Sequence, residues 1–145
     1  MPTYTPQQYR AAWIKALRSG DYKQGRNYLC SDDHYCCLGV LCDLVAPDDW
    51  TGTGVIRYHQ DNCSLPDEDI AIAVGMTNEI GGFDPNGLPV ALHEWLRAKD
   101  KDGTVPLSLA GMNDAGYPFS DIADVIESAP AGLFTDSPIA SECNA

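Results

Sequence analysis

The sequence predicts a mainly α, or α+β, fold: a single small domain of five to six short helices with one small β-hairpin. The chain has 145 residues, the size of one typical domain and enough to bury a sizeable core. Apolar side chains recur at helical spacing in several segments, which glycines and prolines separate. Residues 48–63 are rich in turn residues and contain one short strand candidate, so we place the hairpin around residues 54–60.

A first helix is expected to begin at Thr5 and Pro6, because threonine is a favoured N-cap and proline fits the first helical position. Gly20 can end this helix in the left-handed conformation. Residues 19–28 then form a loop with two glycines, two basic residues and two tyrosines. The apolar face of the helix consists of Tyr9, Ala12, Trp13, Ala16 and Leu17.

A second helix is expected over residues 35–46, ended by Pro47. Asp32 and Asp33 precede it. Either could cap the helix, and the negative charge of both suits the positive end of its dipole. Residues 64–75 favour a third helix, although the apolar run inside them is also compatible with a strand.

Three further helices are expected over residues 88–99, 104–116 and 119–128. Residues 1–129 then form the globular domain. Residues 130–145 are small, polar and interrupted by proline, so we expect a flexible C-terminal tail. The expected core contains Trp13, Leu17, Leu38, Leu41, Leu44, Leu92, Trp95, Leu96, Leu109, Phe119, Ile122 and Ile126.

The net charge of −12 is distributed unevenly along the chain. Residues 1–29 carry five basic residues and one acid, whereas residues 30–145 carry four basic residues and twenty acids. Such an acidic body repels nucleic acids and anionic membranes, so we expect neither as a direct partner. The basic N-terminal segment either docks on the acidic body or presents a local site for an anion.

The chain is expected to be a soluble, cytoplasmic protein. It has no apolar run approaching the roughly 18 residues of a membrane span and no secretory signal. Its six cysteines should therefore be reduced, and most should be small apolar core residues.

Three segments resemble a family of small, uncharacterised proteins from bacteriophages and prophages. They are ALRSGDYKQGR at residues 16–26, YCCLGVLCDL at residues 35–44 and MNDAGYPFSDIAD at residues 112–124. The resemblance implies a phage origin and an accessory role, such as interference with the host. It brings no known activity, and residues 50–104 match the pattern poorly.

The loop after the first helix is the leading candidate for a ligand site. Its glycines allow backbone N–H groups to approach an anion, and its basic and aromatic side chains suit a phosphate and a base. A phosphorylated or nucleotide-like small molecule is the ligand that these residues favour. The alternative is a polar connector whose basic groups pair with nearby acids. The candidate ligand-binding residues are Arg18, Tyr22, Lys23, Gln24 and Arg26.

A cysteine-dependent enzyme is a further hypothesis. Cys36 or Cys37 at a helix start is a candidate nucleophile, with His59 or His93 as its base. The adjacent acids oppose thiolate formation, and the two cysteines point about 100° apart on a helix. Structural, buried cysteines are the alternative, so no catalytic residue is assigned.

A zinc site is a comparable hypothesis, with Cys30, His34 and Cys36 as the principal candidate ligands. Cys37, His59 and Cys63 could complete it, but the spacing matches no common zinc motif. We therefore predict neither a metal nor a cofactor.

The sequence supports three functional hypotheses. The first is a phage accessory protein that sequesters a nucleotide-like molecule to counter host defence. The second is an acidic inhibitor or DNA mimic that blocks a basic, nucleic-acid-binding host protein, for which Asp121, Asp124 and Glu127 offer one acidic helix face. The third is the cysteine enzyme. Binding is favoured over turnover, and homo-oligomers are compatible with the sequence.

Overall fold

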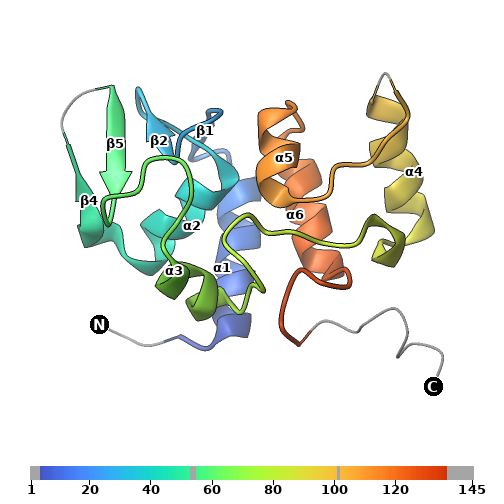
Figure 1. The fold of residues 1–145 in the computed structure, drawn as a ribbon, viewed down its shortest axis with the longest axis horizontal. Helices are drawn as coiled ribbons and strands as arrows, with labels where there is room; N and C mark the ends of the chain where they lie inside the picture. Colours follow the sequence, from blue (N-terminus) through green and yellow to red (C-terminus); the bar gives the residue numbers. More distant parts are fainter. Residues whose placement is uncertain (1–3, 53–54, 101, 137–145) are drawn as a thin grey trace.

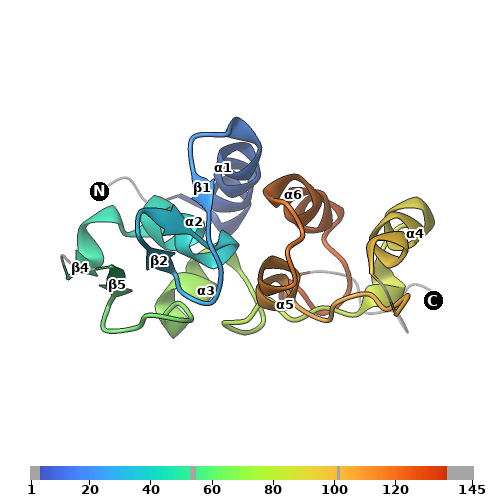
Figure 2. The same ribbon diagram turned by 90° about the horizontal axis from the view of Figure 1, so that it is seen from above.

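The first helix, α1 (Pro6–Ser19), is central to the fold. The structure is a computed structural model and describes residues 4–52, 55–100 and 102–136. On one side, α1 packs against α2 (Cys37–Val45) and α3 (Glu68–Val74), and on the other it packs against α6 (Phe119–Ser128) (Figure 1). The two views agree that β4 (Trp50–Thr51) and β5 (Ile56–His59) lie at one end of the molecule and α4 (Val90–Lys99) at the other (Figure 2).

Local capping explains where α1 begins and ends. The Thr5 hydroxyl accepts the N–H of Gln8 at 3.2 Å, and the Gln8 side chain accepts the N–H of Thr5 at 2.9 Å. This reciprocal capping box and Pro6 at the first turn fix the start. Gly20, at φ 82°, ends the helix as predicted. Of the predicted apolar face, Trp13 and Leu17 are buried and Tyr9 and Ala16 are partly buried against the core, but Ala12 is exposed.

A small sheet covers one end of the molecule. Its strand order is β1-β3-β2-β5-β4, in which β1 and β3 are parallel and the other pairs are antiparallel. The β4–β5 pair forms the expected hairpin, although residues 53 and 54 lie outside the described part. The strands are β1 (Lys23–Gln24), β2 (Cys30–Ser31), β3 (His34–Tyr35), β4 (Trp50–Thr51) and β5 (Ile56–His59).

The expected capping role of Asp32 and Asp33 is wrong. These residues form the two-residue turn between β2 and β3, and both have left-handed φ values, 54° and 63°. Aspartate tolerates this conformation, which primed hairpin turns require. Cys36 caps α2 instead, because its Sγ accepts the N–H of Gly39 at 3.3 Å. The helix consequently begins at Cys37, two residues later than expected.

The remaining helices match the prediction with shifted ends. The third segment is helical, and Gly75 ends it at φ 81°. The fifth, α5 (Leu109–Asp114), is shorter than expected because Ser108 caps it, with its Oγ accepting the N–H of Gly111 at 2.9 Å. Two short 3-10 helices, Pro47–Asp49 and Pro85–Gly87, complete the elements of the described part. The mainly helical α+β fold is confirmed.

Most of the predicted core is buried. Leu44 and Leu92 are only partly buried, and Trp95 is 55% exposed, so its assignment to the core is wrong. The buried members of the predicted set are Trp13, Leu17, Leu38, Leu41, Leu96, Leu109, Phe119, Ile122 and Ile126.

The folded part of the chain continues beyond residue 129. Leu133 and Phe134 are buried, and the Leu133 carbonyl accepts the N–H of Thr77 at 3.0 Å. Arg10 ties the segment to α1, since it forms an ion pair with Asp136 at 2.9 Å and lies over the Phe134 ring. The predicted start of the tail at residue 130 is therefore too early, because residues 133 and 134 belong to the folded part. Its residues 137–145 lie outside the described part. In the part that is described, every helix is too short or too polar to cross a bilayer.

Candidate functional site

The three segments that carry the family resemblance meet at the side chain of Asn113. This residue is fully buried. Its Oδ1 accepts the N–H of Cys37 at 3.1 Å and an Nε2 hydrogen of Gln24 at 3.0 Å, while its Nδ2 donates to the Gly25 carbonyl at 2.7 Å. One amide thus joins the loop after α1, the start of α2 and helix α5. Sequence reasoning missed this role.

Gln24 belongs to the same junction. Its Nε2 also donates to the Tyr117 carbonyl at 2.8 Å, and its Oε1 accepts the N–H of Phe119 at 3.2 Å. Both Nε2 hydrogens of Gln24 and its Oε1 therefore have partners inside the protein. Gln24 therefore holds α6 to the loop.

The other four predicted ligand-binding residues do not converge with Gln24 on one cradle. Tyr22 donates its hydroxyl to Asp43 at 2.6 Å, and Arg18 is engaged by α6. Lys23 and Arg26 are exposed, and neither forms an ion pair with another described residue. The basic segment thus follows both interpretations in part, because Arg18 docks on acids while Lys23 and Arg26 stay free of them.

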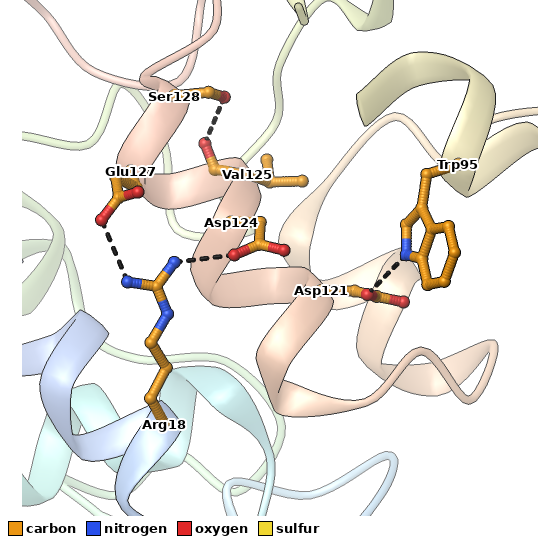
Figure 3. A network of polar contacts seen from close by, with 7 residues as sticks. All are labelled: Arg18, Trp95, Asp121, Asp124, Val125, Glu127 and Ser128. Carbon is orange, nitrogen blue, oxygen red and sulfur yellow. Dashed lines mark hydrogen bonds and ion pairs between the residues drawn. The ribbon is translucent and has the colours of Figure 1, made fainter. Parts of the chain in front are cut away.

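The acidic helix face expected on α6 is occupied from within the molecule (Figure 3). Arg18 forms ion pairs with Asp124 at 2.7 Å and Glu127 at 3.0 Å, and these hydrogen bonds, led by the one to Glu127, raise the pKa of its guanidinium. Asp121 is only 4% exposed and accepts hydrogen bonds from Trp95 and Lys99. These three acids do not form a free row of carboxylates, contrary to the expectation.

The candidate catalytic cysteines lie inside the protein. Cys36 and Cys37 are buried, and burial raises the pKa of the Cys36 thiol to about 11 and that of Cys37 well above its usual range. His59 is fully buried, and its Nε2 contacts the Ala46 carbonyl at 2.8 Å. His93 lies beside Glu94 on α4. Nothing in these contacts pairs a thiolate with a base.

The candidate zinc ligands are likewise separate in role. Cys30 lies buried in β2, where burial raises the pKa of its thiol, and His34 binds the Asp32 carbonyl through Nδ1 at 2.8 Å. Cys36 caps α2. Within the described ranges, no three His, Cys, Asp or Glu side chains are grouped closely enough to hold a metal ion.

Alkylation should distinguish these thiols. At pH 8 a thiol with a pKa of about 11 is ionised in only about one molecule in a thousand, and only the thiolate reacts. We expect iodoacetamide to label the half-buried Cys63 of the native protein, and to label Cys36 and Cys37 only after unfolding. Peptide mass spectrometry identifies the labelled sites. Rapid labelling of Cys36 or Cys37 in the folded protein would restore the enzyme hypothesis.

An open groove lies before and at the start of α3. It has a volume of about 580 Å³ and is lined by residues 61–68 and Glu79. The turn at Gln60 and Asp61, with φ values of 49° and 68°, directs the chain into this wall. The lining contains four carboxylates and no basic residue. We call it the acidic groove. Its carboxylates are those of Asp61, Asp67, Glu68 and Glu79.

The acidic groove combines negative charge with apolar contact area. None of its four carboxylates forms an ion pair with a described residue. Leu65 lines it and is 37% exposed. Ile72, on the outer face of α3, and Ile80, next to Glu79, are also exposed. The acids Asp61, Asp67 and Glu68 were visible in the sequence, but only the structure shows that they share a groove with Glu79.

The fold and these sites define a small acidic α+β domain with an open acidic groove. The chain belongs to the family described as a domain of unknown function, DUF8296, whose family model matches residues 6–130. The comparisons with curated proteins and with solved structures each found no match.

Proposed function

We propose that this protein acts by binding a basic segment of another protein in the acidic groove. The observation that carries the proposal is the concentration of four carboxylates around a concave surface, none of them in an ion pair with a described residue, together with the exposed Leu65 side chain. Lysine and arginine side chains would find complementary potential there, and an apolar residue of the same segment would cover Leu65. This is the chemistry of an amphipathic basic peptide.

The biological setting follows from the resemblance to small phage proteins. A phage accessory protein of this kind would occupy the basic, nucleic-acid-binding surface of a host protein and so inhibit it. The strong excess of acids over residues 30–145 supports such a role, because it accelerates encounter with a basic surface and repels nucleic acid.

Capture of a nucleotide-like molecule is less well supported. Three of its five proposed residues, Arg18, Tyr22 and Gln24, use their polar groups inside the protein. Lys23 and Arg26 would have to hold the anion alone. A double variant, Lys23→Ala with Arg26→Ala, should leave binding of a basic peptide intact or slightly stronger, because it removes two positive charges.

The proposal is tested with a fluorescent peptide of about twelve residues that alternates lysine and leucine. The groove variant carries Asp61→Asn, Glu68→Gln and Glu79→Gln. Its matched control removes three exposed acids elsewhere, through Asp32→Asn, Asp48→Asn and Asp102→Asn. Fluorescence anisotropy measures the dissociation constant of each protein.

We expect the groove variant to bind the peptide about tenfold more weakly or worse, and the control to lose about threefold or less. Raising the salt concentration from about 50 to about 300 mM should weaken binding to the native protein far more than binding to the groove variant. Equal losses in the two variants would show that net charge alone attracts the peptide, and would refute the groove as the site.

A further inference from the structure

Two adjoining hollows lie where α1 meets the last turn of α2. The two helices pack side by side (Figure 1). The first hollow has a volume of about 380 Å³ and the second a volume of about 370 Å³. Ala12 and Leu44 line both hollows, so the two form one continuous groove, which we call the α1 groove. Each volume lies at the lower end of the range of about 300 to 1,000 Å³ that is typical of sites for small molecules.

The first hollow has aromatic and aliphatic walls. Its lining consists of Tyr4, Gln8, Tyr9, Ala12 and Leu44, and none of these described residues is charged. The rings of Tyr4 and Tyr9 stand edge to face, with their centroids 5.3 Å apart and an angle of 82° between their planes. Tyr4 is 49% exposed, and Leu44 is only partly buried against the core. Uncovered ring surface beside an aliphatic wall favours a flat, apolar group as the occupant.

The walls of the α1 groove are held in place. The Gln8 side chain belongs to the capping box that it forms with Thr5. In the second hollow, the Tyr22 hydroxyl donates to Asp43 at 2.6 Å, and the Tyr22 ring meets the Tyr35 ring edge to face at 5.1 Å. A site that is already formed in this way loses little conformational entropy when a ligand enters it.

The second hollow differs from the first in its charges. One basic residue, Lys15, and one acidic residue, Asp21, belong to its described lining. Both are exposed, and neither forms an ion pair with the other or with another described residue. A carboxylate of a ligand would be attracted to the Lys15 ammonium, and an ammonium of the same ligand to the Asp21 carboxylate.

These charges select among the possible occupants. A purely apolar molecule would leave Lys15 and Asp21 without a partner. An amphiphile with a single charge would meet one of the two as a like charge. The end of a peptide chain carries either an ammonium or a carboxylate at its terminus, so it would also satisfy one residue alone. A free α-amino acid carries both groups on the carbon that bears its side chain, so it matches a charge pair beside an apolar hollow.

We infer that the α1 groove binds a free α-amino acid with a large aromatic side chain. The ring occupies the first hollow, between the two tyrosines and Leu44. The carboxylate and the ammonium lie in the second hollow, where they face Lys15 and Asp21. This inference is independent of the acidic groove, which belongs to α3 and the loop before it.

Titration of the full chain with L-tryptophan, followed by saturation-transfer NMR, tests the inference. We expect a dissociation constant of about 0.1 to about 1 mM, the range for a ligand of about fifteen non-hydrogen atoms at a partly open site. Ala12→Phe places a ring where the two hollows meet. Ala11→Phe is the matched control, because it makes the same change at an exposed alanine of α1 outside the described lining of both hollows. Circular dichroism of each variant confirms folding.

Ala12→Phe should weaken the binding of L-tryptophan about tenfold or more, and Ala11→Phe should leave it unchanged. The charges are tested with tryptamine, which lacks the carboxylate, and indole-3-propionate, which lacks the ammonium. Each should bind about fivefold more weakly than L-tryptophan or worse. Lys15→Met should weaken L-tryptophan about fivefold without weakening tryptamine, whereas Lys23→Met, at an exposed lysine of the next loop, should change neither.

Three results would overturn the inference. The first is a native protein that shows no binding of L-tryptophan up to about 10 mM. The second is unchanged binding in Ala12→Phe, which would place the ligand elsewhere. The third is equal binding of L-tryptophan, tryptamine and indole-3-propionate, which would show apolar contact without recognition of the amino acid.

Discussion

Gly39→Ala should prevent the domain from folding. A Cβ at this position of α2 would overlap the carbonyl oxygen of Leu29 and lie 2.7 Å from its carbonyl carbon. Both are backbone atoms that cannot rotate away. The Leu29 backbone is held on both sides, because its N–H donates to the Cys63 carbonyl at 2.6 Å and its carbonyl accepts the N–H of Cys36 at 3.3 Å.

The expected loss exceeds about 4 kcal/mol, a large fraction of the stability of a typical domain. Urea denaturation followed by circular dichroism measures it, or the absence of a folding transition shows it directly. Gly111→Ala is the comparison, since a Cβ there meets only the hydroxyl of Ser108 at 3.0 Å. A free energy of unfolding of Gly39→Ala within about 1 kcal/mol of the native value would contradict the close packing of α2 on Leu29.

The elements that the sequence predicted well are those whose causes are local. Thr5, Pro6 and Gly20 define α1 without reference to the rest of the chain, and the apolar spacing of α6 gives its buried face. Strands of two residues are too short to show alternation, so β1, β2 and β3 were missed. Their pairing depends on turn geometry and on neighbours distant in sequence.

The errors in the core and at the ends have physical causes as well. Trp95 lies on the helical face expected to be buried, but a hydrogen bond to Asp121 and the nearby Lys99 hold its ring at the surface. Leu133 and Phe134 sit in a segment of small and polar residues whose composition hides two strong apolar anchors. In both cases the deciding contacts come from elsewhere in the chain.

The candidate site shows the same limit. The concentration of basic residues in the first 29 positions was visible, but not that Arg10 and Arg18 would be neutralised by Asp136 and by the acids of α6. A charge count gives the charged residues of a segment, whereas ion pairs within the fold decide how many of those charges remain available to a partner. The acidic groove became a candidate for the same reason, since its carboxylates form no ion pair with any residue that the structure describes.

Asn113→Ala should produce the second large loss of stability, about 3–5 kcal/mol, because it removes three buried hydrogen bonds at once. The N–H of Cys37, the carbonyl of Gly25 and one hydrogen of Gln24 would each lose a partner inside the protein. Solvent denaturation gives the value. Asn78→Ala is the matched control, since that side chain is half-buried and accepts one bond, from the N–H of Gly82, and its loss should cost about 1 kcal/mol.

The outcome bears on what the family resemblance means. Asn113 joins all three segments on which that resemblance rests, and Gln24 extends the junction to Phe119. If Asn113→Ala destabilises the protein while its folded fraction still binds the basic peptide, the shared segments specify the fold and the acidic groove specifies the partner. A stability of Asn113→Ala close to that of the native protein would instead contradict the role of this amide in joining the three segments.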